Sequence, residues 1–211
     1  MASDGLSERL AARASLVGVE IAPTLSGQLE AYFRILARWN DRINLTALRL
    51  DPPTDQAIDR LIVEPLVATH LIAEARVWFD LGSGGGSPAI PLKLASPAAQ
   101  LTMVESKARK AAFLTDAIRI LGISGASVET ERIEALASSH PLAGSVDVVT
   151  VRAVRLDPIL FDAVTRLLKP RGRAVLFGMR GYLPTPDGFE AMSDQSLTHT
   201  IQPTVLLKTR D

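Results

Sequence analysis

Cysteine is absent from this chain of 211 residues, and its absence excludes three kinds of chemistry. Without a thiol there is no disulfide, no thiolate metal site and no cysteine nucleophile. Histidine is also scarce, and His70, His140 and His199 do not have the spacing of metal ligands. The sequence therefore predicts a protein without a metal site, and the lack of cysteine fits a reducing compartment.

Long apolar runs and an excess of one charge are missing as well. No run approaches the roughly 20 apolar residues that a membrane-spanning helix needs. The first residues, MASDGLSERLAARA, are polar and include acids, unlike a secretory signal. Both observations predict a cytoplasmic protein. The 23 basic and 23 acidic residues cancel, which argues against nucleic-acid binding over the whole surface but allows a local basic patch.

Hydrophobic residues make up 47% of the chain, which is enough for a globular domain with a sizeable core. The N-terminal part has apolar residues at helical spacing. Thr24 or Ser26 is the expected cap of the second helix, and Thr54 that of the third. We expect residues 1–74 to form a helical extension that packs on a main domain, residues 75–211. The expected helices of the extension are residues 6–19, 25–39 and 55–73.

From residue 77 onward, short apolar runs alternate with amphipathic segments. This alternation predicts an α/β fold with a mostly parallel, seven-stranded sheet and helices on both faces. A ligand of such a sheet binds at the carboxyl ends of the strands, near the point where the strand order reverses. The expected strands are residues 77–81, 101–104, 126–129, 146–151, 173–177, 197–201 and 205–208. The expected helices are residues 89–94, 107–121, 133–137 and 159–168.

Two connections of the C-terminal part are also predicted. Residues 169–172, Lys-Pro-Arg-Gly, are expected to end the last helix before the fifth strand begins, and residues 181–196 are expected to form an irregular surface loop. Gly122 is expected to end the helix that precedes the third strand.

The most informative stretch is the glycine-rich turn that follows the first strand, Asp-Leu-Gly-Ser-Gly-Gly-Gly at residues 80–86. Its glycines allow positive φ angles and leave the backbone open to a ligand, although such a turn can also merely connect two elements. A dinucleotide fingerprint would need a further glycine at Ser87, so that match fails. The turn resembles the first motif of class I S-adenosylmethionine-dependent methyltransferases. An acid at Asp80 suits the cationic amino end of that cofactor.

Two further groups follow the next strands. Glu105 comes at the end of the second strand, where a carboxylate can accept both ribose hydroxyls, but it can also cap the helix that starts at Lys107. Ile133 and Glu134 follow the third strand, where they can border the base of a nucleoside or simply begin a helix. For Ile133 and Glu134 these two interpretations have equal weight.

Arg152 ends the apolar fourth strand, residues 146–151. An arginine at this rim can pair with a carboxylate or phosphate and can stack on a base. The alternative is a solvated surface arginine. Because the strand is apolar and central, we expect Arg152 to face the reacting groups and to act as the catalytic residue.

Three motifs in this order resemble the glucose-inhibited-division-protein-B family. They are W-N-x-x-I-N-L-T from Trp39, D-L-G-S-G-x-G-x-P-x-I-P-L from Asp80 and D-V-V-x-x-R-A from Asp147. The resemblance implies a Rossmann-like class I methyltransferase. It also implies transfer from S-adenosylmethionine to ring nitrogen 7 of a guanine in 16S ribosomal RNA, free or in the small ribosomal subunit, by a monomer without metal.

The resemblance also implies site residues. Gly82, Ser83, Gly84 and Gly86 would line the methionine part of the cofactor, beside Asp80. Glu105 would hold the ribose, Ile133 and Glu134 the adenine, and Arg152 would face the cofactor or the guanine. Asn40, Asn44 and Thr46 would border the mouth of the pocket.

The sequence also departs from the family pattern. Leu61, Glu64 and Pro65 stand where the family usually has His, an acid and Ser, and Ser87 and Ala89 stand where it has Phe and Gly. A lysine usual after the fifth strand falls near Gly178, and Arg180 is the expected substitute. Two alternatives follow, namely a methyltransferase with a diverged RNA or small-molecule substrate, and a non-catalytic nucleotide- or RNA-binding protein.

Overall fold

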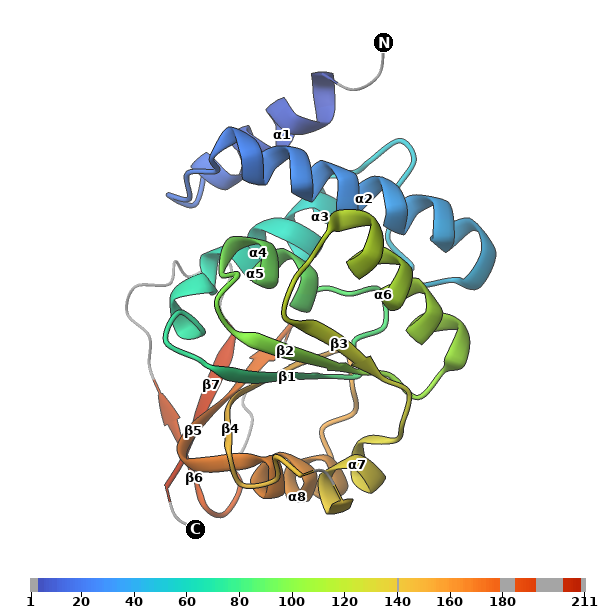
Figure 1. The fold of residues 1–211 in the computed structure, drawn as a ribbon. Coiled ribbons are helices and arrows are strands. Elements are labelled where there is room, and N and C mark those ends of the chain that lie inside the picture. Colours follow the sequence, from blue (N-terminus) through green and yellow to red (C-terminus); the bar gives the residue numbers. More distant parts are fainter. Residues whose placement is uncertain (1–3, 140, 179–184, 193–202, 210–211) are drawn as a thin grey trace.

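A seven-stranded sheet forms the centre of the computed structural model, which describes residues 4–139, 141–178, 185–192 and 203–209. The strand order is β3-β2-β1-β4-β5-β7-β6 (Figure 1). Strands β1 to β5 are parallel and β7 is antiparallel to both β5 and β6, so the predicted mostly parallel sheet is confirmed. The strands are β1 Val77–Leu81, β2 Gln100–Val104, β3 Ala126–Glu129, β4 Val146–Arg152, β5 Leu168–Phe177, β6 Phe189–Met192 and β7 Thr204–Lys208.

The order of the strands reverses at β1. Strands β2 and β3, which follow β1 in the chain, lie on one side of it, and β4 lies on the other side. Phe79 of β1 is therefore paired with Thr102 of β2 and with Val149 of β4. In an open α/β sheet, a reversal of this kind leaves a crevice at the carboxyl ends of the strands in which a ligand binds, and here that position is above β1.

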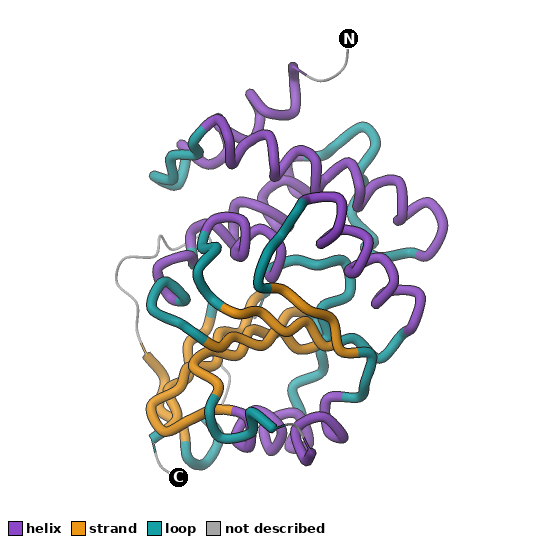
Figure 2. The backbone as a smooth tube through the Cα atoms, viewed as in Figure 1, coloured by secondary structure: helices purple, strands orange, loops and turns teal. Residues whose placement is uncertain are grey.

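Helices cover both faces of the sheet (Figure 2). The helical extension, α5 and α6 lie on one face, and α7 and α8 lie on the other (Figure 1). Each face has its own apolar cluster, and successive residues of β1 supply them in turn, with Trp78 in one cluster and Phe79 in the other. The helices of the main domain are α5 Ala89–Ala95, α6 Ala108–Leu121, α7 Ile133–Ser139 and α8 Pro158–Leu167, and Gly122 ends α6 in a left-handed conformation as predicted.

The extension consists of α1 Asp4–Ser15, α2 Pro23–Ile43 and a continuous helical run. That run comprises α3 Asp55–Ile58, the π-helical turn η1 Asp59–Val63, α4 Glu64–Val67 and the 3₁₀ turn η2 Thr69–Leu71. Thr54 caps the run as predicted, since its hydroxyl accepts a hydrogen bond from the Ala57 N–H at 3.2 Å.

Two predictions for α2 were wrong. The helix begins after Ala22, which has no side-chain cap, because the proline at position 23 fixes the first helical φ without one. It also continues past Trp39 to Ile43, where Asn44 adopts a left-handed conformation with φ 50°. Residues 40–43, beyond the expected end of the helix at residue 39, therefore form the last turn of α2.

The extension and the sheet share one apolar cluster. Leu29 and Phe33 of α2 belong to the same cluster as Trp78 of β1 and Phe113 of α6. Trp39 of α2 adds an edge-to-face contact with Phe113, with ring centroids 5.9 Å apart. The proposed boundary at residue 74 stays a prediction, since one apolar cluster includes residues from both sides of it.

The C-terminal part differs from the sequence prediction in two places. Strand β5 begins at Leu168, directly after α8, so residues 169–172 continue the chain as strand. These residues lie in a register shift of the pairing with β4, between the pairs Val146–Leu168 and Val148–Arg173. The regular parallel pairing therefore resumes at Arg173, where the strand was expected to begin. Strand β6 lies inside residues 181–196, which were expected to be a loop, whereas the strand expected at residues 197–201 lies outside the described residues.

None of the helices in the described part of the chain is long and apolar enough to cross a membrane.

Lys208 ties the antiparallel edge of the sheet to α8. It is buried, and its ammonium donates to the carbonyls of Thr165 at 2.9 Å and of Leu168 at 2.8 Å. We expect Lys208→Met to lower the free energy of unfolding by about 1.5–3 kcal/mol, because two buried carbonyls lose a charged donor. Arg166→Met is the control, since the exposed Arg166–Asp162 pair on α8 should contribute less than about 1 kcal/mol. Urea unfolding of both variants checks this, and equal losses would contradict it.

Candidate cofactor and acceptor site

The glycine turn lies at the carboxyl end of β1, in the crevice between β2 and β4. The backbone N–H groups of Gly82 and Ser83 both donate to the Val104 carbonyl of β2, at 2.8 and 3.0 Å. Gly82, Gly84 and Gly86 have positive φ angles of 72°, 50° and 80°. The turn is thus fixed to the neighbouring strand in a conformation that glycine adopts most readily.

Glycine is required for different reasons along the turn. A Cβ on Gly82 would lie 2.5 Å from a methyl of Val154, and one on Gly86 would lie 2.6 Å from Ile90. A Cβ on Gly84 would meet only the Gly82 carbonyl, at 3.7 Å. The backbone at Gly84 is therefore open, which suits close contact with a ligand.

The helical extension holds the turn from the other side. Tyr32 of α2 is fully buried and donates its hydroxyl hydrogen to the Gly85 carbonyl at 2.8 Å. Leu36 of the same helix packs against Gly85, where an added Cβ would lie 3.3 Å from its side chain. No sequence signal points to this role of Tyr32, because a contact across 53 residues leaves no local pattern.

Asp80 is buried beneath the turn, with 1% of its surface exposed. One carboxylate oxygen accepts a 2.5 Å hydrogen bond from the Thr150 hydroxyl, which in turn accepts one from the Trp78 indole at 2.9 Å. Burial raises the pKa of Asp80 to about 6, and the hydrogen bonds from Ser83 and Thr150 oppose the shift. A cationic group bound next to Asp80 would relieve the cost of this buried charge.

Glu105 connects the turn to α6. One carboxylate oxygen accepts from the Gly84 N–H at 3.0 Å, and the other accepts from the Lys107 N–H at 2.8 Å. The contact with Lys107 is the cap-like interaction considered for this residue. Each carboxylate oxygen has a second lone pair, so contact with a ribose is also compatible with this arrangement, and that role stays a prediction.

The predicted adenine-binding residues begin α7, at the carboxyl end of β3. Ile133 is partly buried and packs against the apolar cluster of the α7–α8 face, while Glu134 is exposed. Both follow the carboxyl end of a strand of the sheet, as the glycine turn and Glu105 also do. This position fits the predicted role in adenine binding, and that role stays a prediction.

Arg152 ends β4, but its side chain is directed into the protein. Its guanidinium donates to the Arg60 carbonyl, to the Ser87 hydroxyl at 3.2 Å and to the Glu64 carboxylate at 3.1 Å. It also lies over the Phe177 ring, 4.9 Å from the centroid. Burial lowers the pKa of Arg152, and Glu64 opposes this. The residue is therefore an internal cation, and neither a solvated surface arginine nor a free group at the rim.

Three of the positions that depart from the family pattern gather around Arg152. Glu64 is its carboxylate partner and Ser87 is its hydroxyl partner. The Ser87 hydroxyl also donates to the Leu61 carbonyl at 2.8 Å. These positions are separate in the sequence, but the structure joins them in one polar cluster.

The residues of the N-terminal signature have mainly local contacts. The Asn40 side-chain oxygen accepts from the backbone N–H groups of Leu45 and Thr46, at 2.7 and 2.8 Å. Thr46 in turn accepts from the Leu48 N–H at 3.1 Å, and Asn44 ends α2. These residues shape the loop after α2. Arg180 lies outside the described residues.

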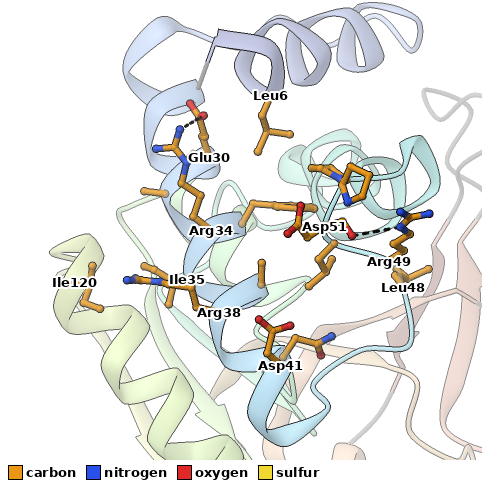
Figure 3. Close-up of a pocket in the computed structure, with 17 residues that line it drawn as sticks. Leu6, Glu30, Arg34, Ile35, Arg38, Asp41, Leu48, Arg49, Asp51 and Ile120 are labelled. Carbon is orange, nitrogen blue, oxygen red and sulfur yellow. Dashed lines mark hydrogen bonds and ion pairs between the residues drawn. The ribbon is translucent and has the colours of Figure 1, made fainter. Parts of the chain in front are cut away.

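A separate cavity of about 880 Å³ lies on the outer side of α2, between α1, the loop after α2 and Ile120 of α6 (Figure 3). Arg34, Arg38 and Arg49 border it together with Asp41 and Asp51. The glycine turn does not line this cavity, so it is distinct from the crevice above β1.

Comparison with known proteins gives a consistent result. A family model described as rRNA small subunit methyltransferase G (GidB) matches residues 26–202. The protein named Ribosomal RNA small subunit methyltransferase G from Stenotrophomonas maltophilia is 38% identical over 172 residues, which cover 80% of this chain and 75% of that protein. The protein of the same name from Nitrosococcus oceani is 34% identical over 177 residues, which cover 84% and 78%.

Solved structures show the same fold at low identity. A SAM-dependent methyltransferase from Aquifex aeolicus aligns with a TM-score of 0.52 and 12% identity, covering 71% of this chain and 89% of that one. This likeness confirms the predicted Rossmann-like class I methyltransferase fold.

The raised pKa of Asp80 predicts how stability depends on pH. The folded protein binds a proton at this carboxyl up to a pH of about 6, whereas the unfolded chain releases it near the ordinary value of 3.8. The free energy of unfolding should therefore fall as the pH rises from about 4 to about 6, by up to about 3 kcal/mol. Asp80→Asn removes this titration, so urea unfolding of the wild type and the variant between these pH values isolates it. A constant difference between the two proteins would contradict the prediction.

Proposed function

The chain belongs to the rRNA small subunit methyltransferase G family, and on this premise we propose that it transfers a methyl group from S-adenosylmethionine to ring nitrogen 7 of a guanine in 16S ribosomal RNA. The match of the family model to residues 26–202 carries the proposal. The open glycine turn above a buried acid supports it. The protein acts in the cytoplasm, as a monomer, on the small ribosomal subunit or its RNA.

The crevice above β1 has the groups that the cofactor needs. Asp80 suits the cationic amino end, and the turn around Gly84 leaves room for the methionine part. In this proposal Glu105 accepts the ribose hydroxyls, and Ile133 and Glu134 border the adenine. The cofactor supplies an activated methyl group, and the protein binds and orients it.

The transfer requires little acid–base chemistry from the protein. Ring nitrogen 7 of guanine already has a lone pair, so no proton has to leave before the attack. The protein must hold the acceptor nitrogen in line with the methyl carbon and keep water out. Arg152 contributes through its place at the end of β4, where it stacks on Phe177 and fixes Ser87 beside the glycine turn.

A basic region suits the RNA partner. Arg38 and Arg42 lie in the last turns of α2, and neither has an ion pair with a carboxylate among the residues described by the structure. Arg109 and Lys110 lie in the first turn of α6, just after Glu105. Because α2 packs on α6, these cations lie on two neighbouring helices, which gives a local basic region on a protein of zero net charge.

The test of the function is methyl transfer to a defined acceptor. Small ribosomal subunits and naked 16S RNA from a strain that lacks the gene are incubated with the purified protein and labelled S-adenosylmethionine. We expect label at one guanine, with a methyl group on ring nitrogen 7, and the same mark lost from the strain and restored by complementation. Label on another RNA or on small molecules would support the diverged methyltransferase instead. Cofactor binding without transfer to any of these acceptors would support a non-catalytic protein.

The cofactor assignment has its own test. Glu105→Ala should weaken binding of S-adenosylmethionine by about 1.5–3 kcal/mol, because a charged acceptor of the ribose hydroxyls is lost. Glu129→Ala is the matched control, since Glu129 ends the neighbouring β3 but is exposed and should leave binding unchanged. Calorimetry with S-adenosylmethionine and with NAD measures the effect of each substitution on cofactor binding and the preference of the protein between the two cofactors. Preferential NAD binding would contradict the assignment.

A further inference from the structure

Two arginines share one buried carboxylate at the carboxyl ends of β4 and β5. The same Glu64 oxygen lies 3.1 Å from Nη2 of Arg152 and 3.4 Å from Nη1 of Arg60. One carboxylate balances one guanidinium, so the group retains a positive charge. This cluster of Arg60, Glu64 and Arg152 adjoins the glycine turn through Ser87.

The three side chains differ in their access to solvent. The side chains of Glu64 and Arg152 are only 6% and 10% exposed, whereas that of Arg60 is 40% exposed. Arg152 uses both Nη atoms on protein groups. Arg60 is therefore the member of the cluster that an incoming molecule can reach.

The end of β5 leaves space for the Arg60 guanidinium. Gly178 follows β5 with a left-handed φ of 74°, and a Cβ at this position would lie 2.6 Å from Nη2 of Arg60. Arg60 itself belongs to the π-helical turn η1, so that Arg60 and Glu64 lie on one side of the helical run. Single π-helical turns of this kind occur often at functional sites.

The location and the charge indicate the ligand. The acceptor must approach the crevice at the carboxyl ends of the strands, where Arg60 lies. Its Nη1 contacts Glu64, and its Nη2 lies close to Gly178 at the end of β5. A guanidinium that is held by a buried carboxylate and still has 40% of its side chain exposed suits a phosphate.

We propose that Arg60 binds a backbone phosphate of the acceptor RNA, and that Glu64 positions it for this contact. The proposal rests on the proposed function for the identity of the RNA. It assigns the contact with the acceptor to Arg60 of η1 and an internal positioning role to the buried Arg152. The contact would fix the RNA strand beside the cofactor turn without reading its sequence.

The experiment compares Arg60→Gln, Arg60→Lys and Arg9→Gln in the full-length protein. Arg9 is the matched control, because its side chain is 41% exposed and ion-paired with Asp55 of the same helical extension, away from the strand ends. Binding of 16S RNA from the deletion strain is measured over a range of KCl concentrations. Affinity for S-adenosylmethionine is measured in parallel by calorimetry.

Arg60→Gln should weaken RNA binding on the order of tenfold. It should also reduce the slope of log affinity against log salt by roughly 0.7–0.9, the value for one phosphate contact. Arg60→Lys should retain the slope, since the charge remains, and Arg9→Gln should match the wild type. Cofactor affinity should be the same in all four proteins, and in transfer assays the KM for RNA should rise more than kcat falls.

Several results would overturn the contact. An unchanged salt slope in Arg60→Gln would do so, as would equal slopes for the Gln and Lys variants. A loss of cofactor affinity equal to the loss of RNA affinity would assign Arg60 a purely structural role. Failure of the proposed function is distinguishable, because wild-type protein that binds RNA but transfers no methyl group refutes the activity while the salt slope still decides the role of Arg60.

Discussion

The hydrogen bonds that fix the glycine turn hold the whole site together. The turn donates two N–H groups to Val104 of β2, receives a hydrogen bond from Tyr32 of α2 and donates a third N–H to Glu105. These contacts connect the central strands, the helical extension and the start of α6 at one point. Because the turn has little side-chain volume of its own, its shape depends on the partners around it.

Much of the fold could be predicted because its signals are local. Alternating apolar strands and amphipathic helices predicted the sheet, and the apolar run before the glycine-rich turn predicted β1. The exceptions lie at the ends of elements. Helix α8 ends before residues 169–172 as predicted, but these residues continue as strand, and residues 40–43 continue α2 beyond its predicted end. Strand β6 is short and has only one neighbour in the sheet, so its sequence carries little signal.

The sequence predicted which strand ends carry the candidate residues, but not the contacts that these residues make. Asp80, Glu105 and Arg152 lie at strand ends, as their spacing indicated, and their roles toward ligands remain predictions. The partner of Arg152 is 88 residues away in the sequence, and it stands where the family has another acid. Taken one at a time, the positions that depart from the family pattern suggest a lost function. Together with Arg152 they form a hydrogen-bonded network. Within it, the Nε of Arg152 is the atom that is buried without a hydrogen-bond partner among the described residues.

The hydrogen bond between Tyr32 and Gly85 has a consequence for the order in which the chain can fold during synthesis. Helix α2 leaves the ribosome early, but the partners of its apolar side, such as Phe113, are made about 80 residues later. Until then that side can pack only on earlier elements such as α1 and α5, and loop closure must precede its complete burial. The docking of α2 on α6 therefore comes late in synthesis, after the glycine turn and α5 have been made.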